Sequence, residues 1–588
     1  MKIQRTFGWV QNPANSLTLQ RVVAIFEPNS DIAKWLLSER IPLLTDNGLL
    51  HNVVEWDKYT AMICSGLPIP YSALKGKGCG RGRRADAKCS GIVQAVIDAQ
   101  KKVEIIVNGE KVAMHKPYTD DWTADGYLRW AISIGFVEYN PEDDTCKISK
   151  LGTQFIYSSG TGFKEVLGQA YLSYPPVCRI LQLLANGEHL TKFEIGRNLG
   201  FTSEAGFTSF PQNIWAQAYQ EHPEERAIIR NNYEGSSDKY ARMICSWLNE
   251  IGWVNISGKQ VVEQYGGKSY SCTIAQAYTI TALGRSNYKR AIGKSSSARV
   301  PKIVFMGMLS TKPVDKDYLR LRRALIIKYT ENEYRSLDDI KNYLNSQGLD
   351  ESTDTIKDDL QGLINIGLNY VLKSGCYKLV DEIKGLVIQS SKCEKGDVSL
   401  IKDKIRPYLN NVNQKYLLLV DLSLDGSSNL EFEIQTLDLL TNELNFNGCH
   451  LGGSRRPDGI IYYSANGLII DNKAYSKGYA LPRHHIDEMV RYLEENNKRD
   501  AGINPNEWWK EFDEGVSHFN FAFISSFFTG QYVPRLQEIK NRTGVNGAVW
   551  DVENLLLVAE ALKRGSLSYA DFFLLFDKND SINFAIDD

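Results

Sequence analysis

Residues 457–473 read PDGIIYYSANGLIIDNK, and this stretch decides how the C-terminal part of the chain folds. Its two apolar runs, 459–463 and 468–470, predict adjacent β-strands, and residues 464–467 between them predict a four-residue hairpin loop. Two aspartates and a lysine therefore stand at the ends of two strands in one sheet.

The predicted loop sets a register for this hairpin, because it pairs Tyr463 with Leu468. Asp458 then lies opposite Lys473, and Asp471 is its diagonal neighbour on the same face, with Cβ atoms about 7 Å apart. Two carboxylates at that separation suit one Mg²⁺, which completes its shell with water and phosphate. A bound metal polarises a phosphodiester and a lysine stabilises developing charge, so the chemistry indicated is phosphodiester hydrolysis. The alternative is a turn aspartate and a solvated lysine.

The pattern resembles the PD-(D/E)xK nuclease motif, and longer stretches around it resemble the FokI family of type IIS restriction endonucleases. The resemblance spans essentially the whole chain. It is carried by HLGGSRRPDG (450–459), DNKAYSKGY (471–479), INPNEWW (503–509), RTFGWVQNP (5–13) and IRNNYEGSSDKYARMI (229–244).

The composition is that of an ordinary globular protein with several domains. Hydrophobic residues make up 43% and charged residues 23% of 588 positions, which argues against a disordered or fibrous chain. No apolar run reaches the roughly 18 residues of a membrane span, so we expect a cytoplasmic protein without a membrane partner. The ten cysteines form no C-x-x-C pair, which supports neither a zinc site nor a disulfide framework.

The formal net charge of −2 is unevenly distributed. Residues 1–300 hold 34 Lys and Arg against 28 Asp and Glu (+6), whereas residues 301–588 hold 34 against 42 (−8). DNA affinity depends on neutralising phosphates, so we expect double-stranded DNA to bind the N-terminal half. The densest basic segment, KGKGCGRGRRADAK (75–88), predicts a DNA contact, although a solvated loop is the alternative.

Three segments repeat one pattern: an amphipathic helix, a glycine stop and a β-run. They are 128–139, 243–256 and 360–372, and their glycines are Gly135, Gly252 and Gly367. A helix followed by such strands is the end of a winged helix, with the glycine as its C-cap. In the second copy the groove-reading helix should begin near Ser236, whereas the acidic helices of the third copy predict protein contacts.

The fold class predicted is therefore multidomain, with α+β winged-helix DNA-recognition domains followed by an α/β PD-(D/E)xK nuclease domain with a mixed central sheet. In the nuclease part we expect helices at 399–422, 430–444 and 482–497 and a strand at 520–525. The expected domains are two recognition domains (1–160 and 161–298), a third winged-helix-like domain (299–384), a linker (385–397) and a cleavage and dimerisation domain (398–588).

The resemblance implies roles for individual residues. Asp458, Asp471 and Lys473 match catalytic positions, with Mg²⁺ on the two aspartates, and Glu433 matches an acidic residue that supports the metal site. The matching DNA-binding positions are Gln11, Asn12, Arg84 and Trp122 in the first domain and Asn231, Glu234, Lys239 and Arg242 in the second. Tyr233 stands where the family pattern has a tryptophan, and the basic loop around Arg84 is longer, so the recognition sequence need not be the family's GGATG.

The resemblance also implies a transient homodimer through Asp487 and Arg491, for which an intrahelical i,i+4 pair is the alternative. The leading function is a Mg²⁺-dependent type IIS restriction endonuclease that cuts to one side of an asymmetric site. A strand-specific nicking endonuclease is a second reading, and a DNA-binding regulator with an inactive nuclease-like domain is a third. Because the sequence shows no methyltransferase motif, a separate modification enzyme is expected as a partner.

Overall fold

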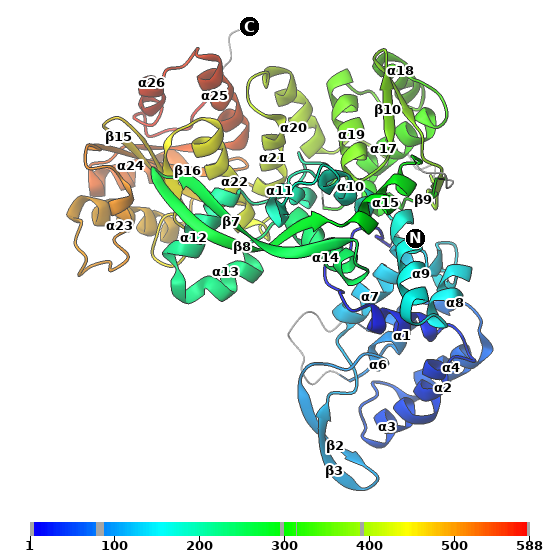
Figure 1. Cartoon of the computed structure of the whole chain (residues 1–588). Helices are drawn as coiled ribbons and strands as arrows, with labels where there is room; N and C mark the ends of the chain where they lie inside the picture. Colours follow the sequence, from blue (N-terminus) through cyan, green and yellow to red (C-terminus); the bar gives the residue numbers. More distant parts are fainter. Residues whose placement is uncertain (1–4, 78–87, 295–298, 313, 389–392, 585–588) are drawn as a thin grey trace.

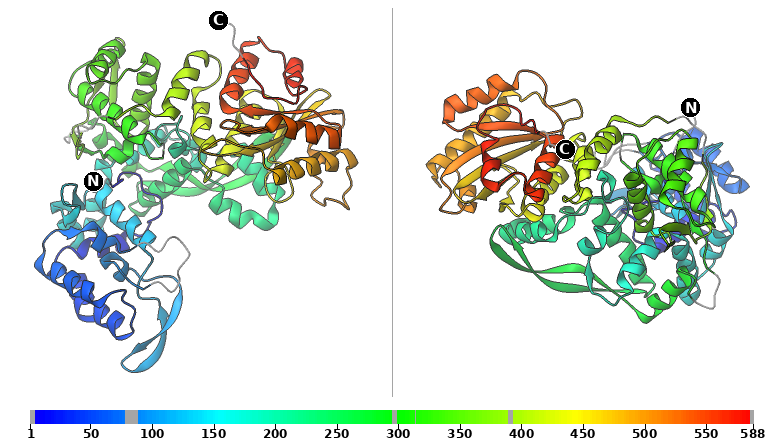
Figure 2. Two further views of the ribbon diagram at one scale, coloured as in Figure 1. Left: turned by 180° about the vertical axis from the view of Figure 1, so that it is seen from behind. Right: turned by 90° about the horizontal axis from the view of Figure 1, so that it is seen from above.

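A computed structural model describes residues 5–77, 88–294, 299–312, 314–388 and 393–584. The nuclease-like part and the first recognition domain lie at opposite ends of the molecule in every view (Figures 1 and 2). Within the described residues no helix is long and apolar enough to cross a membrane. The basic loop with Arg84 falls on residues 78–87, outside the described part.

The three predicted repeats each form a helix, a left-handed glycine and a hairpin. The helices are α7 (Asp121–Ser133), α14 (Ser236–Glu250) and α19 (Thr353–Asn365). Their glycines have φ of +82°, +77° and +106°, so each helix ends where only a residue without Cβ is unstrained. The strands that follow are β4 (Val137–Asn140) with β5 (Thr145–Ile148), β7 (Val254–Tyr265) with β8 (Lys268–Ile280), and β10 (Tyr370–Lys373) with β11 (Cys376–Leu379).

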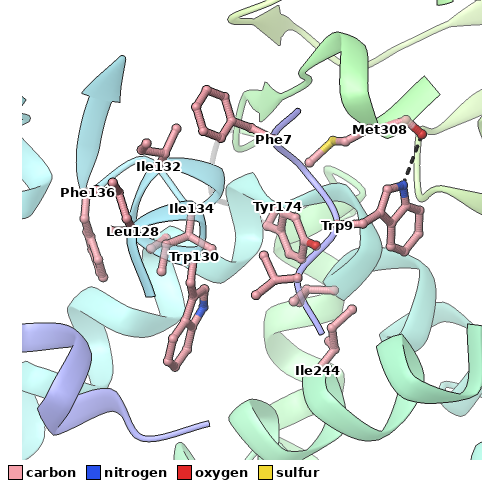
Figure 3. Packing of buried hydrophobic residues seen from close by; sticks show 14 of the residues in the cluster. Phe7, Trp9, Leu128, Trp130, Ile132, Ile134, Phe136, Tyr174, Ile244 and Met308 are labelled. Atoms are coloured by element: carbon pink, nitrogen blue, oxygen red, sulfur yellow. Dashed lines mark hydrogen bonds between the residues drawn. The ribbon is translucent and has the colours of Figure 1, made fainter. Parts of the chain in front are cut away.

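The N-terminal arm joins the first three domains. Trp9 donates through Nε1 to the carbonyl oxygen of Met308 (Figure 3). The hydroxyl of Tyr174 donates to the carbonyl oxygen of Gly8. Trp247 of α14 donates to the carbonyl oxygen of Pro13 at 2.9 Å. Because these contacts come from different domains, the arm holds its own polar residues in a fixed place between them.

The third repeat packs against the second domain through buried charge. Arg322 and Arg323 of α17 (Lys316–Thr330) both bond to Asp359 of α19, and Arg323 also bonds to Glu204. A Cβ on Gly367 would lie 1.8 Å from the carbonyl oxygen of Pro175, so glycine also permits close approach of the two domains. These contacts lie within the chain, so the role of the third domain in protein contacts stays a prediction.

The nuclease part has the mixed central sheet that the sequence predicts. Its strand order is β13-β14-β15-β16-β17, with antiparallel pairing at the first end and parallel pairing at the other. The strands are Asn447–His450, Gly459–Tyr463, Asn466–Lys473, His518–Ser525 and Gly547–Asp551. The helices α22 (Asn429–Asp438), α23 (Arg483–Lys498), α24 (Tyr532–Thr543) and α25 (Val552–Arg564) cover it.

The prediction of one helix over 399–422 is wrong. Helix α20 spans Asp397–Ile405, and a separate helix α21 spans Leu418–Ser423. Pro407 lacks an N–H and disfavours helical backbone before it, so the helix stops there. Asn411 and Val412 lie between the two helices, and their backbone N–H groups donate to the Glu560 carboxylate.

The predicted hairpin register is also wrong. Tyr463 pairs with Asn466, which leaves a two-residue loop with Ser464 at φ +53°. Gly467 belongs to the strand, because a Cβ there would lie 2.9 Å from Phe512 and Val516. Gly467 is therefore a packing glycine inside β15 and not a turn glycine.

Candidate active site and DNA-reading surface

The corrected register changes which of the predicted catalytic residues lie opposite each other. Its continuation places Asp458 across from Asp471 instead of Lys473: Asp458 donates its backbone N–H to Ile470, and its carboxylate accepts the N–H of Asn472. Lys473 reaches back along β15, and its Nζ lies 2.7 Å from Asp471 Oδ1. Asp471 is only 3% exposed, whereas Asp458 and Lys473 are half-buried, so solvent reaches part of the cluster.

The electrostatics of this cluster favour an added cation. Burial, then the charges of Glu433 and Asp471, raise the pKa of Asp458 well above its usual value. Burial likewise raises the pKa of Asp471, although Lys473 opposes the shift. Burial alone would lower the pKa of Lys473, but the two aspartates outweigh it and raise that pKa. One ammonium group therefore does not compensate the surrounding carboxylates.

A divalent cation fits the donor atoms that the structure leaves open. Asp471 Oδ2 is buried and has no hydrogen-bond partner, which is costly for a carboxylate oxygen unless something else binds it. Among the described residues no group of three His, Cys, Asp or Glu has metal-binding spacing. Two carboxylates are enough for Mg²⁺, which takes its remaining ligands from water and substrate phosphate.

Glu433 lies on α22 beside the aspartates and is tied to a histidine that the sequence reasoning did not single out. His450, the last residue of β13, has Nε2 3.4 Å from Glu433 Oε2 and Nδ1 3.0 Å from the Tyr233 hydroxyl. A carboxylate only accepts, so Nε2 carries the proton and Tyr233 donates to Nδ1. Tyr233 comes from the second recognition domain, so a hydrogen-bonded chain links that domain to the nuclease site.

The nuclease part and the second recognition domain share a hydrophobic core. Tyr265 of β7 accepts the backbone N–H of His450, and Gln435 donates to the carbonyl oxygen of Ser209. The β7–β8 ribbon extends to the nuclease part in Figure 1, and Lys268 near its tip pairs with Glu511 at 2.6 Å. Apolar residues of both domains form one cluster that includes Trp215, Ile274, Ile434 and Ile460.

The predicted reading residues of the second domain lie on and just before α14. Arg242 is held by Glu234, whose carboxylate accepts from Arg242 at 2.8 and 3.2 Å. Glu234 is only 2% exposed and also binds Lys192, a partner that sequence reasoning missed. Lys239 is half-buried and Asn231 is exposed. Direct base contacts by these four residues stay a prediction.

The predicted reading residues of the first domain converge. Gln11, Asn12 and Trp122 line one cavity of about 300 Å³, together with Arg129 and Tyr240. Gln11 bonds through its side chain to the hydroxyl of Tyr240, which lies on α14 of the second domain. The arm thus contacts α14 of the second domain here as well as through the bond of Trp247 to Pro13.

The two residues predicted at the dimer contact lie on α23 but do not pair with each other. Asp487 bonds to Arg542 of α24 at 2.7 Å, and both side chains are exposed. Arg491 lies 3.9 Å from Glu495 in the next turn. The intrahelical pair between Asp487 and Arg491 is therefore not formed, and their role across a two-fold stays a prediction.

Comparisons with known proteins match this architecture over nearly the whole chain. Family models of FokI match residues 5–158 (recognition domain, subdomain 1), 163–296 (recognition domain, subdomain 2), 309–375 (D3 domain) and 395–583 (cleavage domain). Type II restriction enzyme FokI of Planomicrobium okeanokoites is 38% identical over 593 residues, covering 99% of each protein. Type II restriction enzyme StsI of Streptococcus sanguinis is 29% identical, covering 96% of this chain and 93% of StsI.

Two solved structures are similar as well. The structure of restriction endonuclease FokI matches with a TM-score of 0.89 and 38% identity, and FokI bound to DNA matches with a TM-score of 0.90 and 37% identity. Each of the two matches covers 99% of this chain and 100% of the FokI chain in the solved structure.

Proposed function

This chain belongs to the FokI family of type II restriction enzymes, and from that premise we propose that it is a type IIS restriction endonuclease. In this proposal the first two domains read a short asymmetric DNA site related to GGATG, and the C-terminal domain hydrolyses phosphodiesters at a fixed distance to one side. The observation that carries it is the pair of aspartates on neighbouring strands, half-buried Asp458 and buried Asp471, whose negative charge Lys473 alone does not balance.

Each residue of the site has a task in this proposal. Asp458 and Asp471 hold Mg²⁺, which when bound supplies Lewis-acid polarisation and an activated water. Lys473, kept protonated by both aspartates, stabilises the charge that develops on the phosphate. Glu433 adds negative charge next to the pair and is oriented by His450.

Digestion of a plasmid, followed by sequencing of the ends, tests this function directly. Ends at a constant distance from one short sequence, formed with Mg²⁺ and lost on chelation, are the expected result. Nicks in one strand only would favour the alternative function, a nicking endonuclease. That alternative applies if no dimer forms through Asp487 and Arg491. Sequence-specific binding without any cleavage would favour the DNA-binding regulator. A separate methyltransferase that protects the same site is the partner we propose.

Arg242→Ala should weaken binding to the cognate site by about 1 to 3 kcal/mol and relax discrimination at one base pair, since arginine donates to the guanine edge. Lys239→Ala should act in the same way at another base pair. Binding to a panel of duplexes, each with one base pair replaced, measures both effects. Lys289→Ala, an exposed lysine of α15 (Ala282–Ala291), is the control. Equal weakening on every duplex would make the residue a phosphate contact.

A further inference from the structure

Arg129 lies on the face of α7 that borders the cavity of the first domain. Trp122, Gly126 and Arg129 follow each other at i, i+4 and i+7, so they share one face of the helix. All three line the same cavity as Gln11 and Asn12. The absence of a side chain at Gly126 leaves room between the other two.

The buried carboxylate of Asp125 forms an ion pair with this arginine. Asp125 is 7% exposed, and its Oδ2 lies 2.7 Å from Arg129 Nε. Its Oδ1 accepts the Tyr71 hydroxyl at 2.7 Å, and Lys75 lies 3.8 Å away. The carboxylate is thus fixed by other groups. It attracts the guanidinium by charge, without a hydrogen bond to Arg129 Nε, and the arginine side chain stays 40% exposed. A guanidinium has five N–H donors in a rigid fork, so contacts to Asp125 and Tyr71 leave donors for a ligand.

The second domain contains a related arrangement. Buried Glu234 accepts two hydrogen bonds from Arg242 of α14, at 2.8 and 3.2 Å, and buried Asp125 forms an ion pair with Arg129 of α7. Both helices are followed by the glycines of the repeat, Gly135 and Gly252. An ordinary exposed i,i+4 pair contributes only about 0.3 to 0.5 kcal/mol and has no need of a buried, multiply bonded acid. The arrangement instead keeps an arginine fork pre-oriented, which lowers the entropy lost when it binds.

We propose that Arg129 is a further specificity-determining residue, which donates its guanidinium fork to a guanine O6/N7 edge, and that Asp125 is its positioning residue. The assignment rests on the proposed DNA-reading function. Arg129, Gln11 and Asn12 line one cavity. The proposed guanine should therefore lie next to the bases that we expect Gln11 and Asn12 to contact.

The test compares Arg129→Lys, Arg129→Ala and Asp125→Asn in the full-length protein. Selection from a pool of random duplexes, without added divalent cation, first gives the site of the wild type; binding to single-base-pair variants of that site then gives a profile for each protein. We expect both Arg129 variants to bind the wild-type site about 10- to 100-fold more weakly and to lose preference for guanine at one position only. Asp125→Asn should lose the same preference more mildly. Lys150→Ala, an exposed lysine of the same domain, is the matched control.

The lysine variant decides between the two kinds of contact. Lysine keeps the charge but not the fork, so equal weakening of Arg129→Ala on every duplex, restored by Arg129→Lys, would show a phosphate contact and overturn the assignment. An unchanged profile in Arg129→Ala would also overturn it, while the wild-type selection would leave the proposed function standing. If the wild type selected no sequence at all, the proposed function would fail together with this assignment.

Discussion

Asp458→Asn, Asp471→Asn or Lys473→Met should each lower the rate of DNA cleavage by about 10³-fold or more, with specific DNA binding unchanged. Each asparagine keeps the shape of the aspartate but removes the charge that attracts a divalent cation, and several kcal/mol of transition-state stabilisation correspond to such a factor. The reading residues lie in other domains, so affinity for the site should survive. Cleavage of a one-site duplex and a gel-shift titration measure the two properties.

Titration calorimetry with Mg²⁺ adds a readout that does not depend on cutting. The two aspartate variants should lose metal binding, whereas Lys473→Met should retain it, because no ligand is removed. Asp513→Asn is the control, since Asp513 is an exposed aspartate of the same domain whose Oδ1 accepts a backbone N–H from Gly515. Near wild-type cutting by any of the three variants would remove that residue from the catalytic set.

Asp487→Arg or Arg491→Asp should each reduce double-strand cutting by an order of magnitude or more, because either change places like charges across the proposed two-fold. An equal mixture of the two proteins should restore cutting, since each variant then meets its complement. Cutting by the wild type on a one-site substrate should rise faster than linearly with enzyme concentration. The rate of double-strand breaks over a range of concentrations measures all three effects.

Arg542→Ala controls for the contact that Asp487 makes within its own chain. The exposed pair of Asp487 with Arg542 should contribute no more than about 1 kcal/mol, so its loss alone should leave cutting nearly unchanged. If Arg542→Ala matched the effect of Asp487→Arg, the residue would act through α24 and not through a second copy. A rate strictly proportional to enzyme, with no rescue on mixing, would exclude the dimer and favour nicking.

Much of the fold could be predicted because its signals are local. The three helices that end at Gly135, Gly252 and Gly367 are visible in the sequence, since helical periodicity and a left-handed stop lie within about fifteen residues of each other. The expected helix over 399–422 is divided into α20 and α21 for a local reason as well, because proline disfavours helical backbone before it.

In the candidate active site, nearby residues are not sufficient to predict the structure. Asp458, Asp471 and Lys473 are recognisable by type and spacing, but their register depends on whether Gly467 makes a turn or packs in a strand. The aromatic ring of Phe512, 45 positions away, decides that question by filling the space a Cβ would need. Packing between distant segments has no fixed spacing in the chain, so no sequence period reports it.

From the sequence we can infer the family, the mixed-sheet nuclease domain at the end of the chain and the residue types available for chemistry and base reading. The pairing of each acid with its arginine, Glu234 with Arg242 and Asp125 with Arg129, becomes visible only in the folded chain. The same holds for the bond of Tyr233 to His450, which connects the second recognition domain to the candidate active site. The physical reason is that residue type fixes what a side chain can donate or accept, whereas burial and the folding of distant segments fix what it meets.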